Sequence, residues 1–257
     1  MMNFALTQGL THMLQLGLGW VLGQAVLSER MRVHDTRKLM HFCLFLAPIA
    51  IGMVLQHDRT PAVFVLSGVS FLLSLLVLVE PIRRRIPVLR TAFAAVDRPE
   101  DRPYSLAWMV TQLLGDYAAM VVCTLWLLSY GQVPMIAVVA MAICFGDGLA
   151  EPVGVRWGRH RYAVPSLVRG RRYHRSIEGS AVVFAATVVV VLIAGWLLPP
   201  GTLIPVAARM PLLILLPVSM TLAEALAPHT WDGPVMYLTG GATLVAALEW
   251  AGPVATG

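Results

Sequence analysis

Residues 178 to 198 read EGSAVVFAATVVVVLIAGWLL, and Glu178 is the only charged residue in this run. A helix needs about 20 predominantly apolar residues to cross the roughly 30 Å of hydrocarbon in a bilayer. The rest of the chain continues the pattern, because 58% of its 257 residues are hydrophobic and only 13% are charged. One soluble core cannot bury so much apolar surface. The sequence therefore predicts an all-α, polytopic integral membrane protein.

Other apolar runs lie on both sides of this one, separated by short polar breaks or by breaks marked with proline and glycine. Together they predict eight spanning helices in a single transmembrane domain that covers residues 1 to 257. The expected spans are 5 to 27, 39 to 56, 61 to 80, 105 to 129, 133 to 150, 178 to 198, 209 to 226 and 235 to 252. No removable signal peptide is expected, because Met1 is followed neither by a basic region nor by a small-residue cleavage site.

The basic residues are distributed unevenly between the two faces that eight spans imply. All but two of the 19 lysines and arginines, Arg59 and Arg209, fall on one face. By the positive-inside rule this face is cytoplasmic, so both termini are expected on the opposite side. The expected location is a bacterial cytoplasmic membrane, with the active site facing the cytoplasm. The cytoplasmic connections are 28 to 38, 81 to 104, 151 to 177 and 227 to 234.

Residues 144 to 161, CFGDGLAEPVGVRWGRHR, combine acids, glycines and arginines. Asp147 and Glu151 are four apart, so on a helix they share a face and could hold one Mg²⁺ together with substrate phosphates. Glycines let a backbone approach a bulky anion, and arginines offer planar donors to phosphate oxygens. The candidate nucleotide-binding residues here are Gly146, Gly148, Gly154, Arg156, Gly158 and Arg159. The alternative is that Gly154 and Gly158 form a helix-packing pair.

Residues 175 to 180, RSIEGS, form the start of the sixth predicted helix. Ser176 is a suitable N-cap, and Glu178, Gly179 and Ser180 make up a first turn whose amide groups and positive dipole favour an anion. Arg175 stands just before this turn. These residues therefore extend the candidate nucleotide site, although Glu178 could instead simply complement the helix dipole.

Residues 37 to 41, RKLMH, lie where the second predicted helix enters the membrane. Arg37, Lys38 and His41 can lie on one helical face because they are separated by three or four positions. His41 could orient a hydroxyl, contact a phosphate or act as a base. Arg37 could equally be a snorkelling anchor, and His41 could be structural.

Residues 224 to 232, EALAPHTWD, leave the seventh predicted helix into a short turn. Carboxylates near membrane depth are costly, so Glu224 needs a partner, which the basic loop from 151 to 177 could provide. The same argument applies to Asp116 in the fourth predicted helix. A polar contact between two helices is the alternative for Asp116.

These four motifs, RKLMH, GDGLAEPVGVRWGRHR at 146 to 161, SIEGS at 176 to 180 and EALAPHTWD, resemble in order the CTP-dependent polyprenol kinases. That family includes dolichol kinase and the plant phytol and farnesol kinases. The resemblance implies transfer of the γ-phosphate of CTP to the hydroxyl of a membrane prenol such as phytol, farnesol, geranylgeraniol or a longer polyprenol. There are departures: Arg175 stands where the family often has lysine, and Gly233 follows Asp232 where asparagine is frequent.

The resemblance implies that Asp147 and Glu178 are the leading Mg²⁺ and nucleotide residues and that Lys38 and Arg175 contact phosphate. The expected metal ligands are Asp147, Glu151, Glu178 and Glu224, and the expected catalytic residues are Asp147, Glu178, His41 and Asp232. Either His41 or Asp232 takes the proton of the alcohol. The expected nucleotide-binding set adds Arg37, Lys38, Arg175, Ser176, Gly179 and Ser180 to the glycines and arginines of the 144 to 161 block.

Two other functions compete with this hypothesis. A CTP-dependent cytidylyltransferase that makes a CDP-lipid has a similar block of acids and glycines, but its usual C-terminal motif is missing here. A transporter of an anionic metabolite would also need acids and arginines in the membrane, but the sequence shows no inverted repeat. The expected partners are a prenol lipid, a nucleoside triphosphate and membrane lipids, and no nucleic acid. The sequence does not indicate an oligomeric state.

Overall fold

The computed structural model describes residues 2 to 56, 60 to 167, 172 to 194, 198 and 206 to 251. This part of the chain contains ten α-helices and one two-stranded antiparallel sheet, so the predicted helical class is confirmed. It divides into two compact units, Met1–Leu114 and Gly115–Gly257. Arg59, residues 168 to 171 of the basic loop, residues 195 to 197 of the predicted sixth span and residue 252 of the last span lie outside the described residues.

The first unit is built on the packing of α1 against α2 and α5. At Gly23 of α1 an added Cβ atom would overlap the backbone of Thr91 in α5, so glycine permits this close approach. Thr36 of α2 donates a hydrogen bond to the carbonyl of Ala95, 2.7 Å away. The helices of this unit are α1 (Met2–Leu27), α2 (Val33–Leu55), α3 (Pro61–Leu76), α4 (Glu80–Arg83), α5 (Pro87–Ala94), the 3₁₀ turn η1 (Pro99–Asp101) and the beginning of α6 (Ser105–Leu128).

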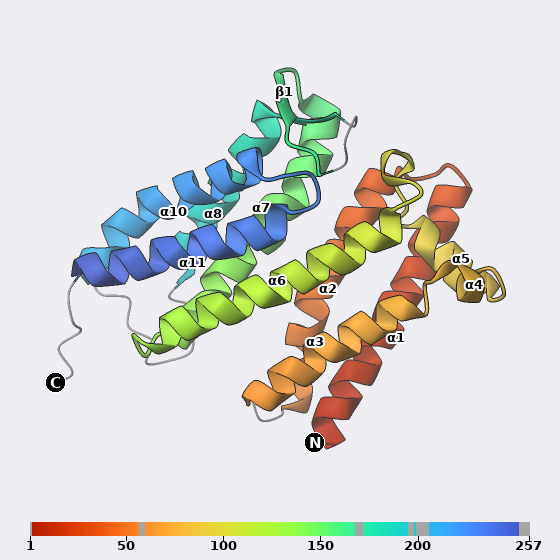
Figure 1. Cartoon of the computed structure of the whole chain (residues 1–257), viewed down its shortest axis with the longest axis horizontal. Coiled ribbons are helices and arrows are strands. Elements are labelled where there is room, and N and C mark those ends of the chain that lie inside the picture. Colours follow the sequence, from red (N-terminus) through yellow and green to blue (C-terminus); the bar gives the residue numbers. More distant parts are fainter. Residues whose placement is uncertain (1, 57–59, 168–171, 195–197, 199–205, 252–257) are drawn as a thin grey trace. The chain divides into compact units, whose positions relative to one another are not determined.

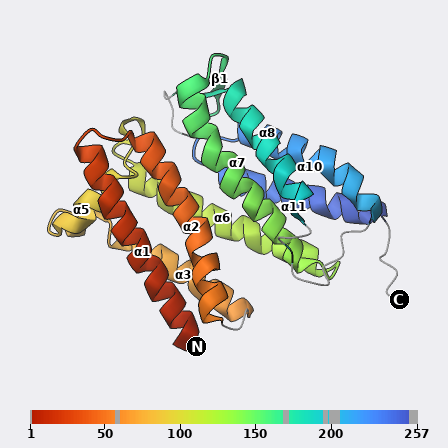
Figure 2. The ribbon, with the colours of Figure 1, turned by 180° about the vertical axis from the view of Figure 1, so that it is seen from behind.

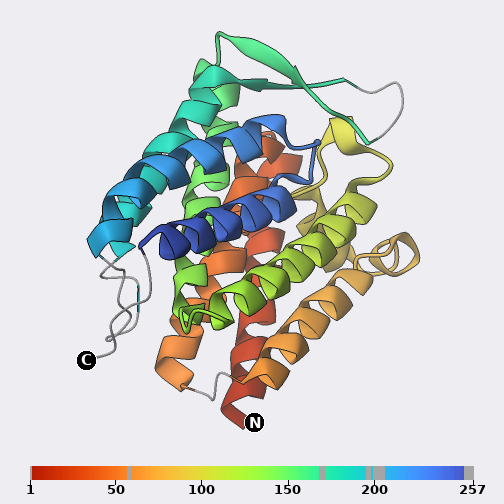
Figure 3. The same cartoon turned by 60° about the vertical axis from the view of Figure 1, so that its left-hand side comes forward.

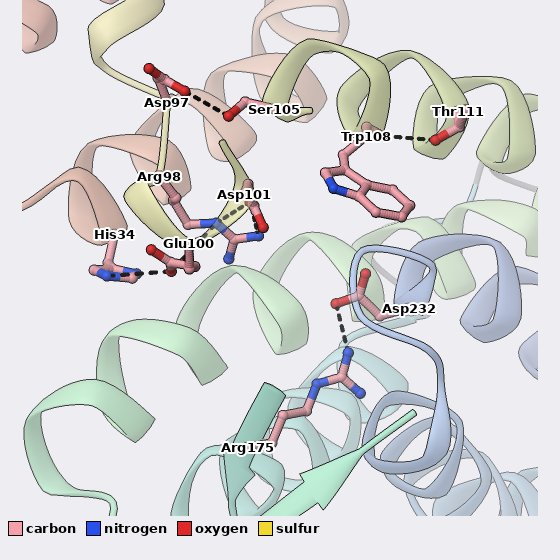
Figure 4. Close-up of polar contacts among 10 residues, drawn as sticks. All are labelled: His34, Asp97, Arg98, Glu100, Asp101, Ser105, Trp108, Thr111, Arg175 and Asp232. Carbon is pink, nitrogen blue, oxygen red and sulfur yellow. Dashed lines mark hydrogen bonds and ion pairs between the residues drawn. The ribbon is translucent and has the colours of Figure 1, made fainter. Parts of the chain in front are cut away.

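A small polar cluster organises the chain between α5 and α6 in this unit. The buried guanidinium of Arg98 donates to Asp101 at 2.7 Å, and Ser105 donates to Asp97 at 2.6 Å (Figure 4). The predicted cytoplasmic connection 81 to 104 is therefore largely structured, since it contains α4, α5 and η1.

The second unit is a set of four mutually packed helices joined by a hairpin. The helix α7 (Ile136–Trp157) packs on α8 (Ile177–Leu192), α8 packs on α10 (Val206–Leu226), and α11 (Asp232–Ala251) packs on both α10 and α7 (Figures 1 and 2). The end of α6 and the 3₁₀ turn η2 (Val133–Met135) precede α7. Strands β1 (Arg161–Val164) and β2 (Tyr173–Ser176) connect α7 to α8, and Figure 3 shows this hairpin beyond the ends of the two helices.

Glycines set the distance between α7 and α8. An added Cβ at Gly146 would lie 3.3 Å from the side chain of Val183, and one at Gly179 would lie 2.9 Å from the carbonyl oxygen of Ala150. At Gly154 the nearest atom to such a Cβ is the Ser176 hydroxyl, at 2.9 Å. These contacts are those expected of the packing alternative for the glycines of the 144 to 161 block.

Gly158→Ala is expected to lower the free energy of unfolding by about 1–3 kcal/mol, the usual cost of adding volume to a filled site. Its Cβ would overlap the carbonyl oxygen of Gly154 and lie 2.7 Å from the Ser176 side chain. Gly9→Ala in α1 is the control, because no atom lies within 4 Å of that Cβ. A mid-helix alanine there is expected to raise stability by about 0.5–1 kcal/mol. Unfolding of both variants in detergent measures the difference, and equal midpoints would contradict the packing argument.

The predicted number of membrane spans is wrong. In the described part of the chain four helical segments are long and apolar enough to cross a membrane: Met2–Leu27, Val33–Leu55, Ser105–Leu128 and Val133–Trp157. The segments Ala62–Leu76, Ile177–Leu192 and Met210–Leu226 are apolar but shorter, and α11 is interrupted by three glycines and bounded by Asp232 and Glu249. The four long apolar helices indicate an integral membrane protein.

Several predicted boundaries also differ from the structure. The second helix begins at Val33 instead of 39, so Arg37 and Lys38 are helical, and α7 continues past residue 150 to Trp157. The apolar runs marked only the hydrocarbon part of these helices, whereas intrahelical hydrogen bonding continues into polar sequence. The hairpin within the basic loop was not predicted.

Candidate functional site

The polar residues of the second unit gather where five chain segments meet. These are the C-terminal end of α7, the β1–β2 hairpin, the N-terminus of α8, the C-terminal end of α10 and the N-terminus of α11. Adjacent helix ends bring unpaired backbone groups and charged side chains together at one end of the unit. We call this end the charged site.

Arg175 of β2 is at the centre of the charged site. Its Nε lies 3.2 Å from Glu224 Oε1. Its Nη2 lies 3.3 Å from Asp232 Oδ2, as Figure 4 shows. Its Nη1 donates to the carbonyl oxygen of Ala227 at 3.3 Å. Arg175 thus ties β2 to both ends of the α10–α11 turn, and the predicted partner for Glu224 from the basic loop is confirmed. The contacts with Ala227 and Asp232 are hydrogen bonds and use two of the five N–H donors of the guanidinium, whereas the contact with Glu224 is an ion pair.

Ser180 and Tyr162 extend this network on the other side of Glu224. Ser180 Oγ donates to Glu224 Oε2 at 3.0 Å, and the Tyr162 hydroxyl lies 2.7 Å from Ser180 Oγ. Because the single proton of Ser180 is directed at Glu224, Tyr162 must be the donor in the second bond. Burial raises the pKa of the Tyr162 hydroxyl, which favours the protonated form that donates. Both carboxylate oxygens of Glu224, only 4% exposed, are therefore bonded to protein groups.

The hairpin is docked onto the α10–α11 turn by a second contact. The rings of Tyr173 and His229 stack with their centroids 3.5 Å apart, and His229 N donates to the carbonyl of Pro165 at 3.0 Å. In the same turn Thr230 has φ of 70°, a left-handed conformation that costs a β-branched residue about 1–2 kcal/mol. Backbone strain of this kind is found where surrounding structure enforces it, often beside functional groups.

The start of α8 agrees with its predicted cap. The Ser176 hydroxyl accepts from Gly179 N at 3.1 Å, so Ser176 is the N-cap. Glu178 accepts from the ring nitrogen Nδ1 of His160 at 2.8 Å and from its backbone N–H at 3.3 Å. Glu178 therefore holds the segment before β1 against the first turn of α8.

Three aspartates lie around the same network. The charges of Asp147 and Asp232 are close enough to act on Glu224, and both also act on Asp116 of α6. Asp147 is buried within α7, at 7% exposure. Asp232 Oδ1 accepts from Gly233 N at 3.2 Å, in the first turn of α11. The charged site thus contains Asp116 as well as the predicted acids.

A magnesium ion is implied by the family resemblance, and the donor set can be compared with that requirement. Among the described residues no group of three His, Cys, Asp or Glu side chains is arranged to hold a metal ion. Glu224 and Glu178 accept from protein donors. Asp147 and Glu151, one turn apart on α7, remain a suitable pair, because Mg²⁺ usually takes one or two carboxylates plus substrate phosphates.

The other predicted nucleotide residues fall into two groups. Gly146, Gly154, Gly158 and Gly179 line the α7–α8 contact described above, and Gly148 is buried in α7. Arg156, in the last turn of α7, and Arg159, just after that helix, are exposed.

The RKLMH residues belong to the first unit. Lys38 is buried on α2, Arg37 precedes it in the same helix, and the His41 ring packs on Phe45 with centroids 4.9 Å apart. The structure places these three residues on α2, and their predicted roles stay predictions.

Sequence reasoning missed several residues of the charged site. Tyr173 and His229 hold the hairpin on the α10–α11 turn, and Tyr162 and His160 contact Ser180 and Glu178 of α8. The tyrosines and histidines at 160 to 162 and at 173 and 174 were a signal that these two parts of the loop are structured.

Comparisons of the chain with models of known protein families, with curated proteins and with solved structures found no match.

Proposed function

We propose that this chain is a CTP-dependent kinase of a membrane prenol. The observation that supports the proposal most is the partly buried guanidinium of Arg175, held between Glu224 and Asp232 beside the capped N-terminus of α8. A fixed guanidinium with donors to spare and a helix N-terminus together suit a phosphate group. The resemblance of the four motifs supplies the nucleotide and the reaction.

In this proposal the protein's own groups mainly position the reactants and neutralise charge, as is usual in phosphoryl transfer. Asp147 and Glu151 would hold the magnesium ion, which would supply positive charge to offset that of the phosphates. Arg175 and the first turn of α8 orient the triphosphate. Glu224 and Ser180 keep Arg175 in place.

We further propose that the charged site faces the cytoplasm of a bacterial cell. Arg156, Arg159, Arg161 and Arg175 all lie at this end of the second unit, and basic residues are retained on the cytoplasmic side of membranes. The prenol tail then stays within the membrane. Moving it from the lipid chains onto an apolar helix surface changes its free energy little.

The decisive experiment supplies purified protein in lipid nanodiscs with Mg²⁺ and CTP labelled at either the α- or the γ-phosphate. Farnesol, geranylgeraniol, phytol, longer polyprenols and diacylglycerol serve as acceptors. Label from the γ-phosphate in an alcohol supports the proposal and identifies the acceptor. Label from the α-phosphate in the lipid instead indicates a cytidylyltransferase. If neither label appears in a lipid product, the kinase and the cytidylyltransferase are both rejected.

A further inference from the structure

Asp116 is held at the charged site by the packing of α6 on α11. An added Cβ at Gly115 would lie 2.7 Å from Pro234 Cγ, and one at Gly233 would overlap Asp116 Oδ1. The contact continues along both helices, since Cys123 Sγ donates to the carbonyl of Tyr237 at 3.0 Å. The Asp116 carboxyl group therefore points at the first turn of α11, where Asp232 begins the helix.

Asp116 Oδ1 is buried and has no hydrogen-bond partner among the described residues. A buried acceptor without a donor is costly, and such an atom in a native structure indicates a missing partner. A ligand that brings a hydrogen-bond donor to Asp116 Oδ1 would supply this missing partner.

The identity of the donor follows from the surroundings. Asp232 already accepts from Arg175 and from Gly233 N, so its two oxygens are engaged. Asp116 also lies on α6, a candidate membrane span with exposed Val121 and Leu125 one to three turns away. A hydroxyl at the end of an apolar chain fits an acceptor that is placed in such a helix.

We propose that Asp116 Oδ1 accepts the hydroxyl of the acceptor alcohol, an inference that rests on the proposed kinase function. As the alcohol oxygen forms its bond to the γ-phosphorus, the bond from that phosphorus to the β,γ-bridging oxygen breaks. CDP leaves with the electron pair, and the hydroxyl proton passes to Asp116. This assigns the proton to a residue other than His41 or Asp232.

The test compares two lipids that differ only in the O–H group. Geranylgeraniol and its methyl ether are titrated into the protein in nanodiscs, without nucleotide. The wild type is expected to prefer the alcohol on the order of tenfold, the size of one hydrogen bond to a buried acceptor. Asp116→Ala is expected to bind both lipids equally. An unchanged preference in Asp116→Ala overturns the inference.

Two further variants separate this role from a structural one. Asp116→Asn keeps an acceptor oxygen but is not a base, so it is expected to keep the preference for the alcohol and to lose roughly 100-fold or more in γ-phosphate transfer. Glu249→Gln removes a carboxylate that accepts from Tyr130 near the other end of α11, and it is expected to change neither result. If the wild type prefers the alcohol but transfers no γ-label, the kinase proposal fails while the hydroxyl contact stands. Full transfer by Asp116→Asn overturns the assignment of the proton.

Discussion

Asp147→Asn is expected to reduce γ-phosphate transfer from CTP by roughly a thousandfold, while the protein still folds. A metal ion contributes several kcal/mol to charge stabilisation in the transition state, and each 1.36 kcal/mol corresponds to a factor of ten in rate. Asparagine has nearly the same shape as aspartate but only a neutral oxygen for the cation. Because Asp147 is buried in the middle of the α7 packing, this isosteric change is the one that least disturbs its neighbours.

The measurement is the initial rate with γ-labelled CTP and the best acceptor from the panel, over a range of Mg²⁺ concentrations. A lost metal ligand should raise the Mg²⁺ concentration needed for half-maximal rate. Glu249→Gln again serves as the control, because it also removes one carboxylate from the second unit. A full rate in Asp147→Asn at ordinary Mg²⁺ concentrations would remove Asp147 from the metal site.

Glu224→Ala is expected to lower the free energy of unfolding by about 3 kcal/mol. Removing one member of a buried ion pair typically costs 3–5 kcal/mol, since the other charge is left in a poorly solvated place. Asp232 still pairs with Arg175 at 3.3 Å in this variant, so the expected loss is at the lower end of the 3–5 kcal/mol range. Ser180 also loses its acceptor, so the effect reaches the first turn of α8.

Denaturant or SDS titration of the protein in mixed micelles measures this loss. The double variant Arg175→Met with Glu224→Leu is the informative control, because a buried ion pair replaced by apolar side chains is often nearly neutral. The losses in the single variants Arg175→Met and Glu224→Leu, added together, should therefore exceed the loss in the double variant by 1 kcal/mol or more, the sign of direct coupling. Simple additivity would show that Arg175 and Glu224 do not support one another.

Local sequence signals correctly predicted the long helices, the cap of α8 and a basic partner for Glu224. The apolar runs located the long helices, the S-x-x-G pattern after Arg175 located the cap of α8, and the burial cost of Glu224 required a basic partner. Each of these follows from residues close in sequence or from a single residue's chemistry.

Pairings between distant segments could not be predicted in this way. Nothing near Asp116 indicates that Gly233 will pack against its carboxyl group, and nothing near Tyr173 indicates the ring of His229. The predicted number of spans was wrong for a related reason. Hydropathy detects apolar composition, but helix length is set by where the chain turns, and α3 and α8 each have only 16 residues.

The register of the hairpin has a consequence for how this chain can vary in length. Side chains along a strand alternate between faces, so a shift by one residue would turn Arg175 away from Glu224 and bring His174 in its place. Four residue pairs, from Arg161 with Ser176 to Val164 with Tyr173, fix that register. Insertions between residues 164 and 173 leave the pairs unchanged and should be tolerated, whereas one added residue between Tyr173 and Ser176 should not. The segment between the two strands is thus the natural place to attach a label or an affinity tag.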